Sequence, residues 1–274
     1  MDFFNNIKTF LQHYLGATTY YNLHSPSIFE FISNTLEDDR NYYAFDEIEA
    51  LRDHLLKDST RLQIVDHGAG SKTTKLKTRT IKEIAASALS PSYQCKVLFR
   101  IVQFKKPMHI LELGTSLGVS TLYLAKANSQ AKLTTIEGSE SISEVALRNF
   151  GYLKQTQIDL KVGNFDDVLP KVLKKTESLD LVYIDGNHQY EPTMNYFRMV
   201  LPYLNENSLV IFDDIYWSKE MCKAWEEIKS FDDVKQSIDL YFFGLVFFNQ
   251  DFKEKKDHKI TYSSLKPWQK FLGS

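Results

Sequence analysis

Two stretches of the chain end in side chains that could carry out chemistry. Asp185 follows an apolar run and precedes His188 by three residues, and Asp213 and Asp214 follow a second apolar run. Both runs predict buried strands, and the carboxyl ends of parallel strands meet at one edge of a sheet. Three carboxylates at one edge repel one another unless a proton or a cation lies between them. Oxygen ligands of this kind suit Mg²⁺, so these residues are candidates for acid–base or metal chemistry.

A glycine-containing turn earlier in the chain predicts a nucleotide site. Residues 107–138 have the pattern of a strand, a turn bracketed by Gly114 and Gly118, a helix, and a second strand that ends at Glu137. Glycines let the backbone approach a ligand closely, and a helix that starts at the turn points free amide groups at it. A carboxylate at the end of the second strand can accept hydrogen bonds from both ribose hydroxyls.

The turn also discriminates between nucleotides. A dinucleotide site needs G-x-G-x-x-G for close approach to a pyrophosphate, whereas this turn is E-L-G-T-S-L-G. Glu112 would repel a pyrophosphate but could pair, directly or through water, with a cationic amino-acid group. A nicotinamide-dependent oxidoreductase is therefore the less favoured alternative. A binding module that kept the fold and lost turnover is another, although the intact acidic residues argue against it.

The turn resembles motif I of the class I methyltransferases that use S-adenosylmethionine. The O-methyltransferase variant of that motif is E-x-G-x-x-x-G-x-S, and Glu112, Gly114, Gly118 and Ser120 match it. The resemblance extends over about residues 107–249 and implies a Rossmann-like α/β fold. That fold has a seven-stranded sheet with helices on both faces and its last strand inserted antiparallel.

The same resemblance implies the residues that bind the cofactor. Glu137 would hold the ribose, and Asn164 with Phe165 would lie beside the adenine. The implied set is Glu112, Gly114, Thr115, Ser116, Gly118, Ser120, Glu137, Gly138, Asn164, Phe165 and Asp185.

The acidic residues carry a second resemblance, to the metal-dependent sugar and macrolide O-methyltransferases. The pattern D-G-x-H-x-Y followed by D-D implies that Asp185, Asp213 and Asp214 hold a magnesium ion that binds the acceptor hydroxyls. A divalent cation lowers the pKa of an alcohol, and His188 could take its proton. We therefore expect methyl transfer to the oxygen of a small hydroxylated acceptor, with Asp185 and His188 as catalytic residues.

Each of these residues also has an ordinary structural interpretation. His188 could cap the helix that follows it or bond a backbone carbonyl, and Asp214 could be a helix N-cap. Trp217 and Trp225 are expected to be packing residues rather than a platform for the substrate. No partner can be named for His24.

The chain is expected to have three segments. Residues 1–106 predict a mainly helical extension or cap, in which Ser25 and Pro26 have the types of an N-cap and a first-turn proline. Residues 107–250 predict the methyltransferase domain, and residues 251–274 a tail. Beyond Gly138 the pattern alternates between helices and strands, which favours a parallel sheet.

Several elements of the second segment are expected from its apolar runs. Residues 158–162, 181–184 and 209–212 predict strands, and Pro170 is expected in the first turn of a short helix. Two apolar runs in residues 237–248 predict a closing antiparallel pair.

Residues 64–71 imitate the nucleotide turn. Asp66, Gly68 and Gly70 have the right spacing, but no second strand with an acidic end is predicted after them. We therefore expect a flexible loop, which could close over the active site and which includes His67. The basic run behind it predicts a solvated face, with contact to an anionic substrate as the alternative; its residues are Lys72, Lys75, Lys77, Arg79 and Lys82.

The bulk composition excludes several classes of protein. A chain of 274 residues with 43% hydrophobic residues can bury a sizeable core, and a net charge of −2 gives no general field for nucleic acid. Cys95 and Cys222 form neither a disulfide framework nor a metal pattern, which indicates a reducing compartment. No membrane-spanning run or signal peptide is predicted, so we expect a soluble cytoplasmic protein. The sequence leaves open whether it forms a homodimer.

Overall fold

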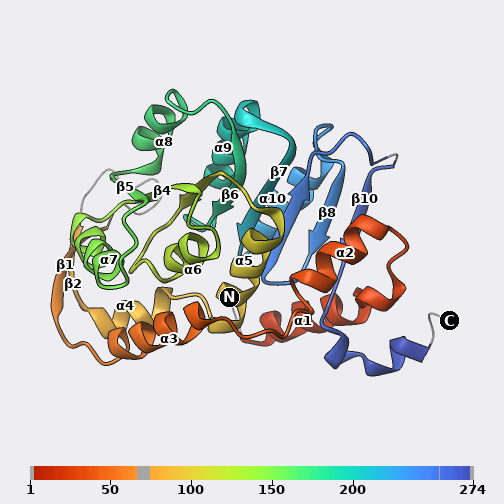
Figure 1. The fold of residues 1–274 in the computed structure, drawn as a ribbon, viewed down its shortest axis with the longest axis horizontal. Coiled ribbons are helices and arrows are strands. Elements are labelled where there is room, and N and C mark those ends of the chain that lie inside the picture. Colours follow the sequence, from red (N-terminus) through yellow and green to blue (C-terminus); the bar gives the residue numbers. More distant parts are fainter. Residues whose placement is uncertain (1–2, 67–74, 253, 272–274) are drawn as a thin grey trace. The chain divides into compact units, whose positions relative to one another are not determined.

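The structure, a computed structural model, describes residues 3–66, 75–252 and 254–271 of the chain (Figure 1). The chain divides into two compact units. Unit 1 comprises Met1–Asp38 and Ser178–Ser274, and unit 2 comprises Asp39–Glu177.

Unit 2 contains three parallel strands in the order β3, β4, β5. These are β3 (His109–Leu113), β4 (Lys132–Glu137) and β5 (Ile158–Val162). In β3 only His109 is exposed and the other four residues are buried, as a strand covered on both faces requires. The helices of unit 2 are α3 (Tyr43–Leu55), α4 (Ile81–Ala88), α5 (Ser92–Lys105), α6 (Val119–Ala127), α7 (Glu140–Tyr152) and α8 (Phe165–Leu173).

Unit 1 contains five strands, and the residues of the predicted acidic site lie at the ends of two of them, β6 and β7. Strand β6 (Leu179–Ile184) pairs in parallel with β7 (Leu204–Asp213). The remaining strands are β8 (Gln236–Asp239), β9 (Phe243–Phe247) and β10 (Lys256–Lys259). Strand β9 runs antiparallel to both β7 and β8, whereas β10 is parallel to β8.

The helices of unit 1 come from both ends of the sequence. The α-helices are α1 (Phe3–Gly16), α2 (Pro26–Asn34), α9 (Tyr190–Val200) and α10 (Lys219–Ser230). The short 3-10 helices are η1 (Tyr20–Asn22), η2 (Leu201–Tyr203), η3 (Ser263–Leu265) and η4 (Pro267–Phe271). Ser25 is the N-cap of α2 and Pro26 lies at its first position, as expected, although the Ser25 side chain makes no capping hydrogen bond.

The predicted alternation of strands and helices is confirmed, and so is the inserted antiparallel strand, which is β9. The described residues contain the seven expected strands, β3 to β9, and three others. One of these three, β10, lies in the segment predicted to be a tail. The boundaries 1–106, 107–250 and 251–274 stay a prediction, since the two compact units divide the chain differently.

The mainly helical character of the first hundred residues is confirmed, with one exception. Strands β1 (Arg61–Asp66) and β2 (Lys75–Thr80) pair antiparallel, so the prediction that no second strand follows the turn is wrong, although β2 has no acidic end. Because β2 pairs directly with β1, the pair cannot form the strand–helix–strand unit that binds a nucleotide. Residues 67–74, with Gly68, Gly70 and the loop predicted there, lie outside the described residues.

Pro170 is not in the first turn of its helix, contrary to the prediction. It lies inside α8, because that helix begins five residues earlier at Phe165. Asn164 is the N-cap, and its side chain accepts a hydrogen bond from the backbone N–H of Asp166.

Candidate active site

The turn between β3 and α6 has the conformation that its glycines predict. Gly114, Ser116 and Gly118 all have positive φ, at 105°, 48° and 84°. The backbone N–H groups of Gly114 and Thr115 both donate to the carbonyl oxygen of Ile136 in β4, at 3.0 and 3.3 Å. The turn is thereby fixed to the neighbouring strand.

Gly118 is required by packing as well as by conformation. A Cβ atom at Gly118 would lie 2.5 Å from Cε1 of Phe150 and 3.3 Å from Cβ of Ala146. Both neighbours belong to α7, so the absence of a side chain lets the start of α6 approach that helix closely.

Glu137 at the end of β4 is fixed against this turn. Its Oε2 accepts a hydrogen bond from the backbone N–H of Ser116 at 2.8 Å, and its Oε1 accepts one from that of Ser139 at 2.9 Å. Each carboxylate oxygen can accept more than one hydrogen bond, so this arrangement is compatible with the ribose contact predicted for Glu137. Gly138, which lies between Glu137 and Ser139 in the sequence, is half-buried.

Glu112 is completely buried and is bound by protein hydroxyl groups. Ser120 donates to its Oε1 at 2.7 Å, and Thr121 and Thr135 donate to its Oε2 at 2.5 and 2.7 Å. Burial raises the pKa of Glu112, and the three hydroxyl donors oppose that rise. The predicted contact between Glu112 and a cationic amino-acid group, direct or through water, stays a prediction.

Two of the three residues that donate to Glu112, Thr121 and Thr135, were not predicted. Thr135 lies opposite Glu112 in the register of β3 and β4, and its hydroxyl also contacts that of Thr115 at 2.6 Å. Since Thr135 gives its proton to Glu112, Thr115 is the donor in that pair. The signal in the sequence was a pair of threonines in an otherwise apolar strand, next to the predicted acidic end.

The end of β5 adds the last part of the predicted cofactor site. Gly163 has a φ of 138°, and its N–H donates to the backbone oxygen of Glu137 at 2.8 Å. Asn164 caps α8, and Phe165 is the first, half-buried residue of that helix. The residues predicted to hold the nucleoside therefore gather at the carboxyl ends of three neighbouring parallel strands of unit 2.

In unit 1, Asp185 and His188 lie directly after β6. His188 Nε2 is 3.5 Å from Oδ1 of Asp185, and the Tyr183 hydroxyl donates to Oδ2 at 3.4 Å. Burial lowers the pKa of His188, and the charge of Asp214 opposes that effect. The imidazole therefore favours its neutral form near pH 7, which is the form that can accept a proton.

The backbone that presents His188 is in an unusual conformation. Asn187 and His188 have φ values of 62° and 29°, which are rare for residues with a side chain. The Asn187 amide donates to the Tyr196 hydroxyl at 2.6 Å, so α9 holds this turn in place. Neither Asn187 nor Tyr196 was predicted as a site residue.

The acidic pair at the end of β7 is largely withdrawn from solvent. Asp213 is 5% exposed, and its pKa is raised well above its usual range by burial first and then by the charges of Asp185 and Asp214. Burial also raises the pKa of Asp214, while His188 lowers it. A proton on Asp213 is thus one way in which the repulsion between these carboxylates is relieved.

The predicted magnesium ligands do not form a metal site in this arrangement. Within the described ranges, no three His, Cys, Asp or Glu side chains converge in a way that could hold a metal ion. The charges of Asp185 and Asp214 both raise the pKa of Asp213, but the three side chains do not converge in the way that the resemblance implied.

Both capping alternatives for the acidic site are excluded. The N-cap of α10 is Ser218, whose hydroxyl accepts the N–H of Met221 at 3.1 Å, so Asp214 does not cap that helix. The N-cap of α9 is Gln189, so His188 does not cap the helix that follows it.

The two tryptophans have different environments. Trp225 lies on the buried face of α10 and is 1% exposed, which confirms its packing role. The same prediction is wrong for Trp217, which is 61% exposed. Because α10 begins only at Lys219, Trp217 lies in the loop before the helix, with its ring centroid 6.1 Å from that of His188.

Comparisons with known proteins show similarity to methyltransferases. Residues 111–215 match a family model described as a methyltransferase domain. A catechol O-methyltransferase of Niastella koreensis is 29% identical over 142 residues, which cover 50% of this chain and 63% of that protein. The O-methyltransferase hkm8 of Aspergillus hancockii is 35% identical over 135 residues, or 46% of this chain and 50% of that protein. The chain thus spans only about half to three-fifths of the length of these curated relatives.

The fold has relatives among solved structures. An O-methyltransferase from Bacillus cereus, in complex with SAH, superposes with a TM-score of 0.55 at 19% sequence identity. The match covers 81% of this chain and 97% of that one.

The chain therefore has the Rossmann-like α/β fold of the class I methyltransferases. Residues 111–215, which match the methyltransferase-domain model, include the turn on which the nicotinamide alternative depended, so that alternative is not supported. Among the described helices, none combines the length and the hydropathy that a bilayer crossing requires.

Proposed function

We propose that the protein is an S-adenosylmethionine-dependent O-methyltransferase that acts on a small hydroxylated molecule. The observation that carries this proposal is the position of Glu137, whose carboxylate is held by backbone N–H groups beside the turn from Gly114 to Gly118. The similarity to proteins named as O-methyltransferases, one of them in complex with SAH, supports it.

Unit 2 is assigned the cofactor. Glu137 binds the ribose hydroxyls, and Asn164 with Phe165 contacts the adenine. The backbone of the turn, including Thr115 and Ser116, lies against the amino-acid part of the cofactor. The hydrogen bond from Ser120 to Glu112 connects the two ends of this turn. Gly138 completes the predicted contacts from unit 2, and Asp185 is the predicted contact that belongs to unit 1.

Unit 1 is assigned the acceptor and its proton. Methyl transfer is an in-line displacement, in which the acceptor oxygen forms a bond to the methyl carbon as the bond from that carbon to the sulfonium sulfur breaks. The acceptor hydroxyl loses its proton to the neutral imidazole of His188, and Asp185 orients that ring. The sulfonium becomes a neutral thioether, so no cationic side chain is needed to stabilise the leaving group.

Magnesium stays a prediction, and the mechanism above routes no step through it. If the ligand set Asp185, Asp213 and Asp214 forms only when the acceptor is present, magnesium added to chelator-treated protein will raise turnover. Turnover that stays unchanged as magnesium is added would reject the predicted magnesium site and leave His188 as the proton acceptor.

Two substitutions test the assignment of the two halves. Gly114→Arg should abolish binding of S-adenosylhomocysteine, because Gly114 has a φ of 105° in the turn that approaches the ligand. Asp185→Ala should largely retain that binding, measured by calorimetry, and lose turnover.

A panel of hydroxylated compounds, assayed with the wild-type protein, tests the activity itself. Tight binding of S-adenosylhomocysteine without any methylated product would favour the alternative of a binding module. Retained turnover in Asp185→Ala would contradict the role given to Asp185.

A further inference from the structure

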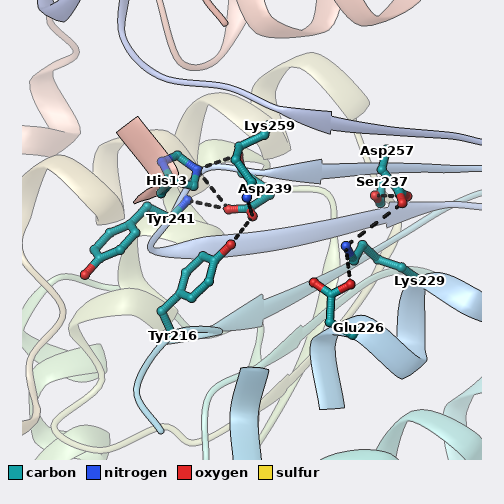
Figure 2. Close-up of polar contacts among 9 residues, drawn as sticks. All are labelled: His13, Tyr216, Glu226, Lys229, Ser237, Asp239, Tyr241, Asp257 and Lys259. Atoms are coloured by element: carbon teal, nitrogen blue, oxygen red, sulfur yellow. Dashed lines mark hydrogen bonds and ion pairs between the residues drawn. The ribbon is translucent and has the colours of Figure 1, made fainter. Parts of the chain in front are cut away.

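A buried polar cluster lies in unit 1, outside the residues assigned so far (Figure 2). Its centre is Asp239, the last residue of β8, which is 4% exposed. His13 Nε2 lies 3.0 Å from Oδ1 of Asp239, and the backbone N–H of Tyr241 donates to the same oxygen at 2.9 Å. The Tyr216 hydroxyl donates to Oδ2 at 2.5 Å. We call His13, Tyr216, Asp239 and Tyr241 the Asp239 cluster.

The electrostatics show that Asp239 is held as a carboxylate. Burial alone would raise its pKa, but the hydrogen bonds and charge of His13, together with Tyr216 and Tyr241, lower it overall. Lys259 Nζ, at 4.0 Å from Oδ2, faces the same group. Hydrogen bonds to a buried charge are stronger and more directional than those between neutral groups, so the cluster fixes its members' positions.

Aromatic contacts add to this rigidity. The rings of Tyr216 and Tyr241 are stacked, with centroids 5.3 Å apart and an angle of 18° between their planes. His13 packs edge-on against both, at 6.0 Å from Tyr216 and 5.5 Å from Tyr241. His13 of α1 is thus joined to Tyr216, which follows β7, and to Asp239 at the end of β8, although His13 and Asp239 are 226 residues apart in sequence.

The cluster bears on the acceptor site because Tyr216 belongs to a loop beside His188. It is part of residues 214–217, which we call the acceptor loop because it carries Asp214 and Trp217 beside His188. Ile215 is fully buried and the N–H of Asp214 donates to the carbonyl of Phe242 at 3.0 Å, so the start of the loop is anchored. Towards its exposed end, at Trp217, the side-chain anchor is the bond from Tyr216 to Asp239.

We propose that His13, Asp239 and Tyr216 are positioning residues for the acceptor: α1 orients Asp239, which fixes Tyr216 and thereby holds Trp217 against His188. This inference rests on the proposed function, because it treats the loop as the wall of the acceptor site. It also gives the first part of the chain a role in catalysis, through one residue of α1.

Steady-state kinetics test the proposal. Tyr216→Phe removes the donor and keeps the ring, so KM for the acceptor should rise about tenfold while KM for S-adenosylmethionine stays within about twofold, as expected for one lost charge-assisted hydrogen bond. His13→Leu should act in the same direction. His13→Gln, which keeps an N–H donor in a similar place, should restore the acceptor KM.

Ser237→Ala is the matched control. Ser237 is a buried residue of the same strand, and its hydroxyl donates to Asp257 at 2.6 Å without contact to the acceptor loop (Figure 2). It should leave both KM values unchanged. A merely structural role of the cluster would lower thermal stability in Tyr216→Phe but would leave its acceptor KM unaffected, as in Ser237→Ala.

The fluorescence anisotropy of Trp217 tests the positioning without any turnover. In a Trp268→Phe background the remaining tryptophans are Trp217 and the buried Trp225, which resists quenching by acrylamide. Tyr216→Phe should lower the anisotropy of the quenchable tryptophan and Ser237→Ala should not. If Tyr216→Phe does not fold, the pair His13→Leu and His13→Gln answers the same question.

The two possible failures are distinguishable. No methyl transfer by the wild type would reject the proposed function, while the Trp217 signal would still test the loop. An active wild type whose acceptor KM and Trp217 anisotropy are the same in Tyr216→Phe as in Ser237→Ala would overturn the positioning role.

Discussion

Strained residues mark the ends of the strands that carry the site. Asn187, His188 and Asp214 have positive φ although each has a side chain, and Ser116 shares this property at the end of β3. Such conformations cost about 1–3 kcal/mol each and persist where the surroundings impose them. Here the imposing contacts are identifiable: Tyr196 holds Asn187, and Glu137 holds Ser116. The strain supports the assignment of these three strand ends to function.

Gly118→Ala should destabilise the protein by about 2 kcal/mol or more, because the new Cβ would meet Phe150 and the positive φ disfavours any side chain. Gly151→Ala is the control, since a Cβ at Gly151 meets nothing within 4 Å in α7, and it should be neutral or stabilise by up to about 1 kcal/mol. Urea unfolding of the two variants measures the difference. Equal free energies of unfolding would show that the approach of α6 to α7 is not constrained by Gly118.

At the scale of elements, apolar periodicity predicted the strands that are buried in the core and missed the strands whose residues are mostly polar. Strands β3, β4 and β6 are recognisable because burial demands Ile, Leu and Val. Strand β10 has the sequence KDHK and its position follows from pairing with β8, including a hydrogen bond between His258 and Gln236 at 2.7 Å. The β1–β2 pair was missed for the same reason, because β2 is largely polar.

The site was predictable to a similar degree. Residue types and spacing placed Glu112, Glu137 and Asp185 at strand ends, because an acidic residue after an apolar run is visible in one sequence. The partners of those residues were not visible, since Thr135 contacts Glu112 only through strand register, and Asp239 contacts His13 across most of the chain. Contacts of that kind depend on the packed structure.

Helix α1 is joined to the strands of unit 1 by a charge, so that junction should respond to pH. The folded state lowers the pKa of Asp239, so Asp239 stabilises the protein above the unfolded value of about 3.9. That stability is lost as pH falls from there through the folded pKa. Asp239→Asn should therefore cost about 1–3 kcal/mol at pH 7, and the difference from wild type should shrink below about pH 4.

Urea unfolding of both proteins between neutral and acidic pH measures this effect. Asp257→Asn is the control, because that side chain is 55% exposed and its loss should matter little at any pH. A cost for Asp239→Asn that is the same at all pH values would mean that the charge of Asp239 does not contribute.

At the scale of the whole molecule, the proposed reaction is divided between two units that have different tasks. Unit 2 contributes the glycine turn, Glu137 and the cap of α8, which we propose to bind the part of the cofactor that does not react. Unit 1 contributes His188, whose lowered pKa suits it to accept the acceptor's proton. The first part of the chain belongs to both units, since α1 and α2 lie in unit 1 and α3 to α5 in unit 2.

This division predicts that cofactor binding and turnover can be lost separately. S-adenosylhomocysteine at about 100 times its Kd should stabilise the wild type by about 2.7 kcal/mol, and the oxidised nicotinamide cofactor should have no effect.

Glu137→Gln should lose most of that stabilisation, because an amide cannot accept the N–H groups of Ser116 and Ser139 with both of its terminal atoms. Glu140→Gln, an exposed change in the first turn of α7, should keep it, and His188→Ala should keep it while losing turnover. Thermal unfolding with each ligand gives the comparison, and stabilisation by the nicotinamide cofactor, or a full response in Glu137→Gln, would contradict the assignment of unit 2.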